Sequence, residues 1–386
     1  MPSCLMKPCL IAVCLFTVFS ITVVAQTPSG WVIDVEPLYM NVKGFDQHSG
    51  DVVQQTVTFA TNPPRVTDLR TRQPITNTMN AGTRLLGGIQ YRRQGWSGGA
   101  NAWWFTSNDQ ISGRVTSPGA LGPSSFAVNT VSMWNETLVP VENDLEPSGF
   151  SPVDFRSQGR LRTYALDFFA FRPLTGDASS NRIDLILGTK VGYLKTSQNQ
   201  GFTERAFVFD YFQFGSHLNN VITLGTDAEA RFVGIGPLIG IQAETKWGYV
   251  TIQPAATMAL LIGNARQKGL ATDTDEITVA QSPLGPFLTC PVSLVRLGCL
   301  PVHSEIAFST SPRTFVPVTE LRLKLEVKLT NHIAVGGSGF TAIWSSAPIP
   351  PAYTITHADA GPGLNWQLQH ETLRFAGAGV AFTVNF

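Results

Sequence analysis

The chain has 386 residues and a formal net charge of zero, with only 14% charged residues, 10% aromatic residues and 35 glycines. This composition argues against a soluble helical enzyme, because lysine-rich helical periodicity is missing. It also argues against nucleic acid as a partner, since no basic patch stands out.

The first predicted element is a secretory signal peptide over residues 1–25. Lys7 precedes an apolar run from Cys9 to Ala25, which closes in small and branched residues before Gln26. This order is typical of an export signal with its cleavage site. After Ala25, no unbroken apolar run is long enough to cross a bilayer as a helix. We therefore expect an exported mature chain, in which residues 26–386 form a single domain.

Alternating segments long enough to cross a bilayer as tilted strands follow the signal peptide. Ten can be placed, at 31–42, 83–92, 96–106, 159–172, 182–195, 229–241, 247–262, 315–329, 333–344 and 372–386. Long and short connections alternate between them without exception, as in outer-membrane barrels with long extracellular loops and short periplasmic turns. The sequence therefore predicts an all-β fold, a transmembrane antiparallel up-and-down β-barrel of about 10 strands, in the bacterial outer membrane.

Two further segments leave the strand count open. Residues 52–59 and 206–214 also alternate and would raise the number of strands to 12. Counting them as full spans would put the turn at 93–95 outside and break the alternation of loop lengths, so we expect them to extend hairpins above the membrane. A β-sandwich is the alternative architecture, although it requires no such asymmetry of connections.

The aromatic residues predict two girdles at the membrane interfaces. The final strand places Val380, Phe382, Val384 and Phe386 on one face, and it stops on an aromatic residue as closing strands of such barrels do. The periplasmic girdle is predicted to hold Trp31, Tyr91, Trp96, Trp247 and Phe386, and the outer girdle Tyr39, Trp104, Tyr193 and Trp344.

Segment 315–329 divides most clearly into two faces. Its leucines occupy one face, which we expect to meet lipid, and its charged residues occupy the other, which we expect to line the lumen. The same phase elsewhere gives twelve predicted lumen-facing charges: Asp34, Glu36, Arg84, Arg92, Asp167, Asp184, Lys190, Glu320, Arg322, Lys324, Glu326 and Lys328. Six are basic and six acidic, so they can pair across strands.

Two interpretations of this lumen follow. It is either a water-filled channel of weak ion selectivity, or a salt-bridged and partly filled interior. Small inward residues such as Gly234, Gly240 and Ser338 would leave room for water, although glycine also lets the strands of a barrel wall bend and coil. A barrel of ten or twelve strands allows at most a narrow pore.

Two cysteines, Cys290 and Cys299, follow the signal peptide. Export implies an oxidising compartment, so we predict one disulfide closing a small loop, with two free thiols as the alternative. A zinc site would need more ligands than the nearby His303 supplies, and we expect neither a metal nor another cofactor. Histidines at 217, 303, 357 and 370 fall in predicted outer loops without a serine or acid close by on a strand. We therefore expect no enzymatic activity and assign no catalytic residue.

Residues 231–241, with the sequence RFVGIGPLIGI, resemble a signature of the legionella-type major outer-membrane protein family of pore-forming barrels. Segments 84–91, 316–323 and 373–382 resemble the same family in the same order. The resemblance implies a pore that allows passive passage of small solutes or ions. It also implies that Phe386 is an assembly signal for the barrel-insertion machinery. Intermolecular disulfide networks, as in some relatives, are not expected with two cysteines.

The expected partners follow from this interpretation. They are outer-membrane lipid, the barrel-insertion machinery and the small solutes or ions that pass, and the sequence leaves open whether copies of the chain associate. The alternative function is a structural or adhesive surface barrel that acts through its extracellular loops, motivated by the long connections at 107–158 and 263–314.

Overall fold

A computed structural model of the chain describes residues 30–44, 47–58, 65–67, 72–77, 82–92, 96–115, 119–122, 125–132, 153–174, 181–208, 217–280, 302–358 and 361–386. The predicted signal peptide and the pair Cys290 and Cys299 lie outside these residues. No helix in the described part of the chain is long and apolar enough to cross a membrane.

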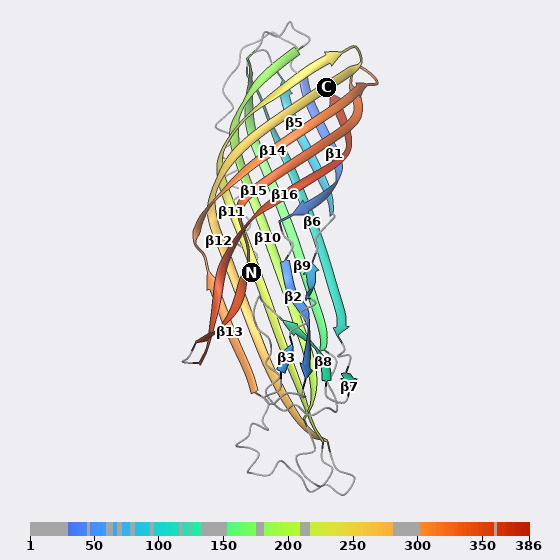
Figure 1. Cartoon of the computed structure of the whole chain (residues 1–386). Helices are drawn as coiled ribbons and strands as arrows, with labels where there is room; N and C mark the ends of the chain where they lie inside the picture. Colours follow the sequence, from blue (N-terminus) through green and yellow to red (C-terminus); the bar gives the residue numbers. More distant parts are fainter. Residues whose placement is uncertain are drawn as a thin grey trace.

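Ten antiparallel strands form a closed barrel whose order follows the chain, and the last strand pairs with the first (Figure 1). They are β1 (Gly30–Lys43), β5 (Gly82–Arg92), β6 (Ser97–Val115), β9 (Val153–Pro173), β10 (Asn181–Val208), β11 (His217–Trp247), β12 (Val250–Ala280), β14 (Arg313–Lys328), β15 (Ile333–Ala358) and β16 (Gly361–Asn385). Each corresponds to one predicted segment. The predicted barrel of ten strands is therefore confirmed.

The other strands lie outside the barrel wall. β13 (Val302–Thr310) pairs with β12 beyond the point where β14 begins. A second sheet contains β2 (Gln47–Thr58), β3 (Arg65–Thr67), β4 (Arg72–Asn77), β7 (Gly119–Gly122) and β8 (Ser125–Ser132). Segment 52–59 largely falls in β2, and residues 206–208 extend the β10–β11 hairpin. Neither adds a strand to the wall, which explains why the count is ten.

The seam between β16 and β1 closes the barrel. Val32 pairs with Asn385 and Ile33 with Val384, and the backbone N–H of Phe386 donates to the carbonyl of Trp31 at 2.9 Å. This closure leaves the wall without an edge, so the backbone polar groups of its strands find partners within it. The assembly role of Phe386 itself stays a prediction.

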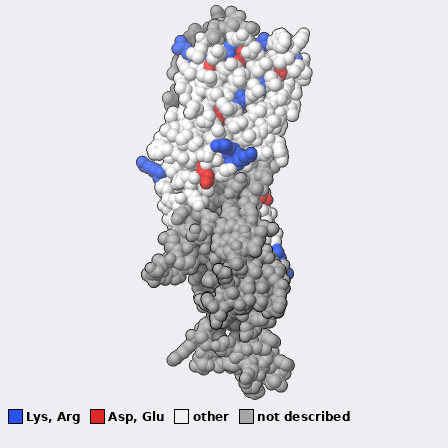
Figure 2. All heavy atoms as spheres, in the orientation of Figure 1, with Lys and Arg blue, Asp and Glu red and all other residues white. Residues whose placement is uncertain are grey.

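The outer face of the wall is an apolar belt between two groups of aromatic residues. Leu321, Leu323 and Leu325 alternate with buried or partly buried charged residues of β14 and are exposed. At the end that holds Gly30 and Phe386, the exposed aromatic residues include Trp31, Trp96, Trp247, Tyr249 and Phe386; at the other end they include Tyr39, Trp104, Tyr164 and Phe315. On the face turned to the viewer in Figure 2, charged side chains gather toward the ends of the described wall and are few between.

Trp344 departs from its predicted place in the outer girdle, because its side chain is fully buried inside the barrel. The inward face of β15 holds Phe340, Ala342 and Trp344, whereas Ile343 belongs to the outward face. Segment 333–344 has no charged residue, so its two faces look alike in sequence. The prediction that Ser338 points inward agrees with the structure, and the same phase turns Trp344 inward, so its placement in the outer girdle was wrong.

The apolar belt generates a stability prediction. Leu323→Arg places a charge near the middle of the outward face and should lower the free energy of unfolding in lipid vesicles by about 2–4 kcal/mol. Leu329→Arg, on the same face but just beyond the end of β14, should cost only about 0–1 kcal/mol. Denaturant titration followed by tryptophan fluorescence measures both. Equal losses for the two variants would contradict the placement of the belt.

Candidate functional site in the barrel lumen

Lys324 is the centre of one ionic group inside the barrel. Its ammonium lies 2.7 Å from Asp34 Oδ1 and 2.9 Å from Glu326 Oε1, and it donates to the Thr383 hydroxyl at 2.8 Å. The Thr383 hydroxyl also lies 2.6 Å from Asp34 Oδ1. These four side chains come from β14, β1 and β16, because the same alternation that turns the leucines of β14 outward turns its charges inward. The group therefore spans the seam of the barrel.

Arg322 extends this group along β14. Its guanidinium contacts the Glu36 carboxylate and lies 3.7 Å from Asp34 Oδ2. Glu36 is fully buried, and a buried carboxylate is tolerated when a cation and hydrogen bonds offset its lost hydration. Arg322 thus ties β14 to β1 at a second level of the lumen.

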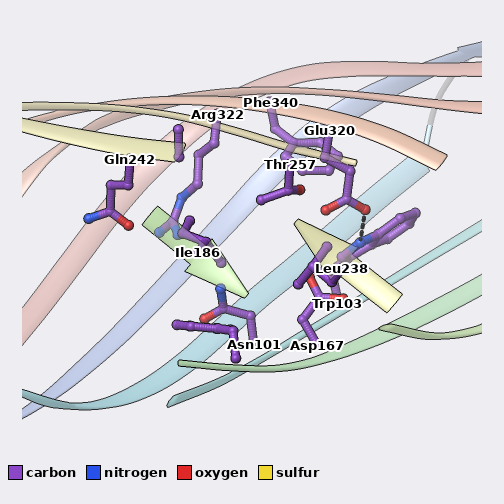
Figure 3. Close-up of a pocket in the computed structure, with 12 residues that line it drawn as sticks. Asn101, Trp103, Asp167, Ile186, Leu238, Gln242, Thr257, Glu320, Arg322 and Phe340 are labelled. Carbon is purple, nitrogen blue, oxygen red and sulfur yellow. Dashed lines mark hydrogen bonds between the residues drawn. The ribbon is translucent and has the colours of Figure 1, made fainter. Parts of the chain in front are cut away.

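Glu320 joins opposite walls of the barrel. The Trp103 indole N–H donates to Glu320 Oε1 at 3.0 Å, as the dashed line in Figure 3 marks. Trp103 belongs to β6 and Glu320 to β14, and four strands separate them in either direction around the ring. Lys190 lies 2.9 Å from the same carboxylate oxygen and 2.6 Å from Asp167 Oδ1. Side chains therefore bridge the full width of the lumen.

A packed apolar layer adjoins this ionic network on the side away from Gly30 and Phe386. Trp103 packs its edge against Phe340, Trp344 and Phe375, with ring centroids 5.7–6.1 Å apart. The surrounding buried residues are Leu38, Met40, Val42, Phe105, Leu161, Ala165, Leu194, Phe232, Leu261, Ala265, Val316, Val318, Ala342, Ala347, Ile349 and Leu373. Nine of the ten wall strands contribute to this layer. It fills the cross-section of the barrel.

At the outer side of this layer, a side chain of β12 contacts β15 and β16. The buried Gln267 of β12 donates to the carbonyl of Ile349 at 3.0 Å and to that of Gln369 at 2.9 Å. β15 is irregular here, with register shifts on either side of the segment Ala347–Ile349 and a positive φ of 54° at Ser346. Ala347 and Ile349 are buried as a result. The bulged segment therefore contributes Ala347 and Ile349 to the same apolar layer.

A small cavity borders the ionic network; its lining includes Trp103 and Phe340 of the apolar layer and Phe169, Ile186 and Leu238 of a second buried apolar cluster (Figure 3). Its polar lining comes from Asn101, Asp167, Gln242, Thr257, Glu320 and Arg322, and the volume open to the centres of water molecules is about 50 Å³. One water needs roughly 10–15 Å³ by this measure, so the cavity has room for a few waters.

The structure places most of the predicted lumen charges together. Those on the inner face are Asp34, Glu36, Asp167, Asp184, Lys190, Glu320, Arg322, Lys324 and Glu326, all buried except for the partly buried Arg322. Lys328 is different, since it is the last residue of β14 and is exposed at the end of the barrel rather than enclosed in the lumen. The side chains of Arg84 and Arg92 lie outside the part that the structure describes.

We did not predict the apolar layer from the sequence, although the alternation of inward and outward residues in segment 96–106 indicates it. Trp104 was predicted in the outer girdle, and Trp103 and Phe105 alternate with it, so the same phase turns both inward. Gly234 was expected to leave room for water, but a Cβ there would lie 2.4 Å from the Phe232 ring and as close as 3.2 Å to Leu261. Large neighbours therefore occupy the space that small residues leave. Within the described residues, no group of His, Cys, Asp or Glu could hold a metal ion.

A closed antiparallel barrel with an apolar, aromatic-bordered outer face defines an outer-membrane β-barrel protein. The chain belongs in the bacterial outer membrane, where the end with Gly30, Phe386 and the short turns is periplasmic and the end with extended hairpins is extracellular.

Comparison with known proteins finds solved structures with a similar fold but no family to which the chain can be assigned. No protein-family model and no curated protein matches the chain. Solved structures with a similar course include the Escherichia coli outer membrane protease OmpT (9% identity, TM-score 0.42, covering 94% of this chain and 99% of that one). Another is the transport unit of the Escherichia coli autotransporter AIDA-I (8% identity, TM-score 0.24, covering 96% of this chain and 94% of that one). A third is the P. putida toluene transporter TodX (7% identity, TM-score 0.21, covering 94% of this chain and 91% of that one). At such values, they add nothing to the architecture that the strand pairing defines.

The ionic network generates a second stability prediction. Glu320→Gln keeps an acceptor for Trp103 but leaves Lys190 with Asp167 as its one remaining carboxylate in the pairs described above. Breaking a buried pair in this way should cost about 3–5 kcal/mol in free energy of unfolding. The control is Glu229→Gln, which breaks the partly exposed pair with Lys195 and should cost about 0–1 kcal/mol. Denaturant titration in vesicles compares them; a loss at Glu320 no larger than at Glu229 would refute the bridging role.

Proposed function

We propose that this chain is a sealed outer-membrane barrel that acts structurally or adhesively, through the strands it carries beyond the membrane. The observation that carries this proposal is the packed layer across the lumen. Trp103 and Trp344 are buried at its centre, and residues from nine wall strands surround them. A solute would have to displace these side chains to pass, which costs the packing energy of a protein core.

The length of the extracellular part supports the same proposal. β11 continues from Arg231, near the outer girdle, to His217, about 45 Å along the strand at ~3.3 Å per residue. The sheet of β2, β3, β7 and β8 lies toward this same end in Figure 1. Strands of this length are more than a bilayer requires. They give the barrel a large surface on which other molecules can dock.

A passive pore for small solutes or ions is the second candidate. The small cavity and the charged periplasmic half of the lumen favour it, as does the resemblance of residues 231–241 to the legionella-type family. Passage would then require the apolar layer to move aside.

We also propose no catalytic activity, because no histidine lies among the inward side chains that the structure describes.

Planar-bilayer recording separates the two candidates. The refolded mature chain should show no regular single-channel steps, whereas the double variant Trp103→Ala and Trp344→Ala should conduct because it removes the two indoles at the centre of the layer. Its current should favour cations, since the network around the lumen has five carboxylates (Asp34, Glu36, Asp167, Glu320, Glu326) and three cations (Lys190, Arg322, Lys324). Trp104→Ala, next to Trp103 but on the outward face, is the matched control and should stay silent. Regular steps from the unmodified chain would favour the pore.

Deleting residues 119–132 tests the surface role. This removes β7 and β8 and leaves all ten wall strands. Heat-modifiable gel mobility should be retained, while adhesion of cells that express the chain, to polystyrene and to one another, should fall to the level of cells without it. The double tryptophan variant is the control, because it alters the lumen and should adhere normally. Full adhesion after the deletion would count against this surface.

A further inference from the structure

A row of four basic residues crosses the outer face of the barrel. Arg162 of β9, Lys195 of β10, Arg231 of β11 and Arg266 of β12 are direct partners in the strand register, each opposite the next. Their chain neighbours are buried inside, so alternation turns all four side chains away from the lumen. We call these four residues the basic row.

The basic row borders the apolar belt. Two residues closer to the membrane centre, Tyr164 and Tyr193 pair in register with ring centroids 5.4 Å apart. The Arg231 guanidinium lies over the Tyr193 ring, 5.3 Å from its centroid. Because aromatic girdles sit at the headgroup level, the guanidinium and ammonium groups of the row lie at the height of the outer-leaflet headgroups.

The charge of this surface is not balanced by carboxylates on the same strands. Neighbouring strands lie about 4.8 Å apart, so like charges placed directly opposite destabilise the sheet. Among the described residues, Glu229 pairs with Lys195 at 2.8 Å, and Asp227 follows two residues further out. Arg160 and Lys268, also exposed, flank the row and add positive charge. This surface therefore has six cations and two carboxylates among the described residues, and the excess of positive charge favours binding of an anion.

We propose that the basic row binds the phosphorylated headgroup of an outer-leaflet lipid of the lipid A type, with the acyl chains lying on the apolar belt. Three of the four residues are arginines, whose planar fork binds phosphate oxygens in a bidentate manner. Cations on adjacent strands can hold one phosphate together. The tyrosines below offer an apolar surface to the start of the acyl chains.

The position of the row favours a lipid over other anions. The row lies on the outer wall of the barrel, where Arg162, Arg231 and Arg266 are exposed to the surroundings rather than enclosed around a free phosphate ion. Lipid chains on the belt directly below would deliver phosphates to this height and hold them there, which raises their effective concentration. An acidic protein segment would have to displace those lipids first.

The periplasmic end of the same strand provides a matched control. Arg172 of β9 also points outward and lies over an aromatic ring, 5.8 Å from the centroid of Trp96. Its register partner on β10 is Leu185 rather than another cation. Arg172→Gln therefore removes a similar cation–aromatic contact without touching the row.

The test is native mass spectrometry of the refolded mature chain in detergent, titrated with lipid A, with dephosphorylated lipid A and with inorganic phosphate. Lipid A should bind and should not be displaced by inorganic phosphate, and the dephosphorylated lipid should bind at least about tenfold more weakly, since each cation near an anionic surface contributes appreciably. Changing all four residues of the row to glutamine should weaken binding of lipid A by at least about tenfold, whereas Arg172→Gln should leave it unchanged.

Two results would overturn the proposal. One is equal binding of the phosphorylated and dephosphorylated lipids, which would mean that the belt alone retains them. The other is unchanged affinity in the glutamine variant. If the fourfold variant fails to show heat-modifiable mobility, the pair Arg162→Gln and Arg266→Gln, at the two ends of the row, replaces it and should still weaken binding several-fold.

Discussion

The structure depends on the requirement that a sheet in lipid must pair all of its backbone polar groups, which it meets by closing on itself. Once β16 meets β1, every second side chain of ten strands is directed into a space that ten strands make narrow. Whatever the sequence places at those positions must either pack or pair. The ionic network and the apolar layer are the two ways in which this chain satisfies that requirement.

The two halves of the lumen solve the problem differently. In the periplasmic half, Lys190 and Lys324 are buried and each lies within 3 Å of two carboxylates, so lost hydration is offset by charge-assisted contacts, beside a small apolar cluster of Phe171, Ile186, Leu238 and Ala259. In the outer half, indole and phenyl rings pack against one another across the lumen, with fewer polar contacts than in the periplasmic half. Trp103 belongs to both halves, because its rings pack in the layer while its N–H reaches Glu320. The boundary between the halves is therefore joined by one side chain.

Much of this could be predicted from the sequence, because alternation is a local property. The leucines and charges of β14 fix the phase of that strand, and loop lengths fix the direction of the strands. Trp344 was misplaced because β15 has no charge in its first half, and the inward placement of Ser338 was not extended by alternation to Trp344. The packing partners of Trp103 could not be predicted either, because contacts across the lumen join residues that no sequence period relates, such as Glu320 at a separation of 217 residues.

The seam has a consequence for the lifetime of the folded barrel. Asp34 of β1, Thr383 of β16 and Lys324 of β14 meet across it, so separating the first and last strands also pulls Asp34 away from the buried Lys324 ammonium. The backbone ladder and these side-chain contacts are therefore lost together at the seam. Such coupling raises the barrier to unfolding more than it raises equilibrium stability, provided that the network forms only after closure. Slow unfolding would then give the folded barrel a long lifetime in the membrane.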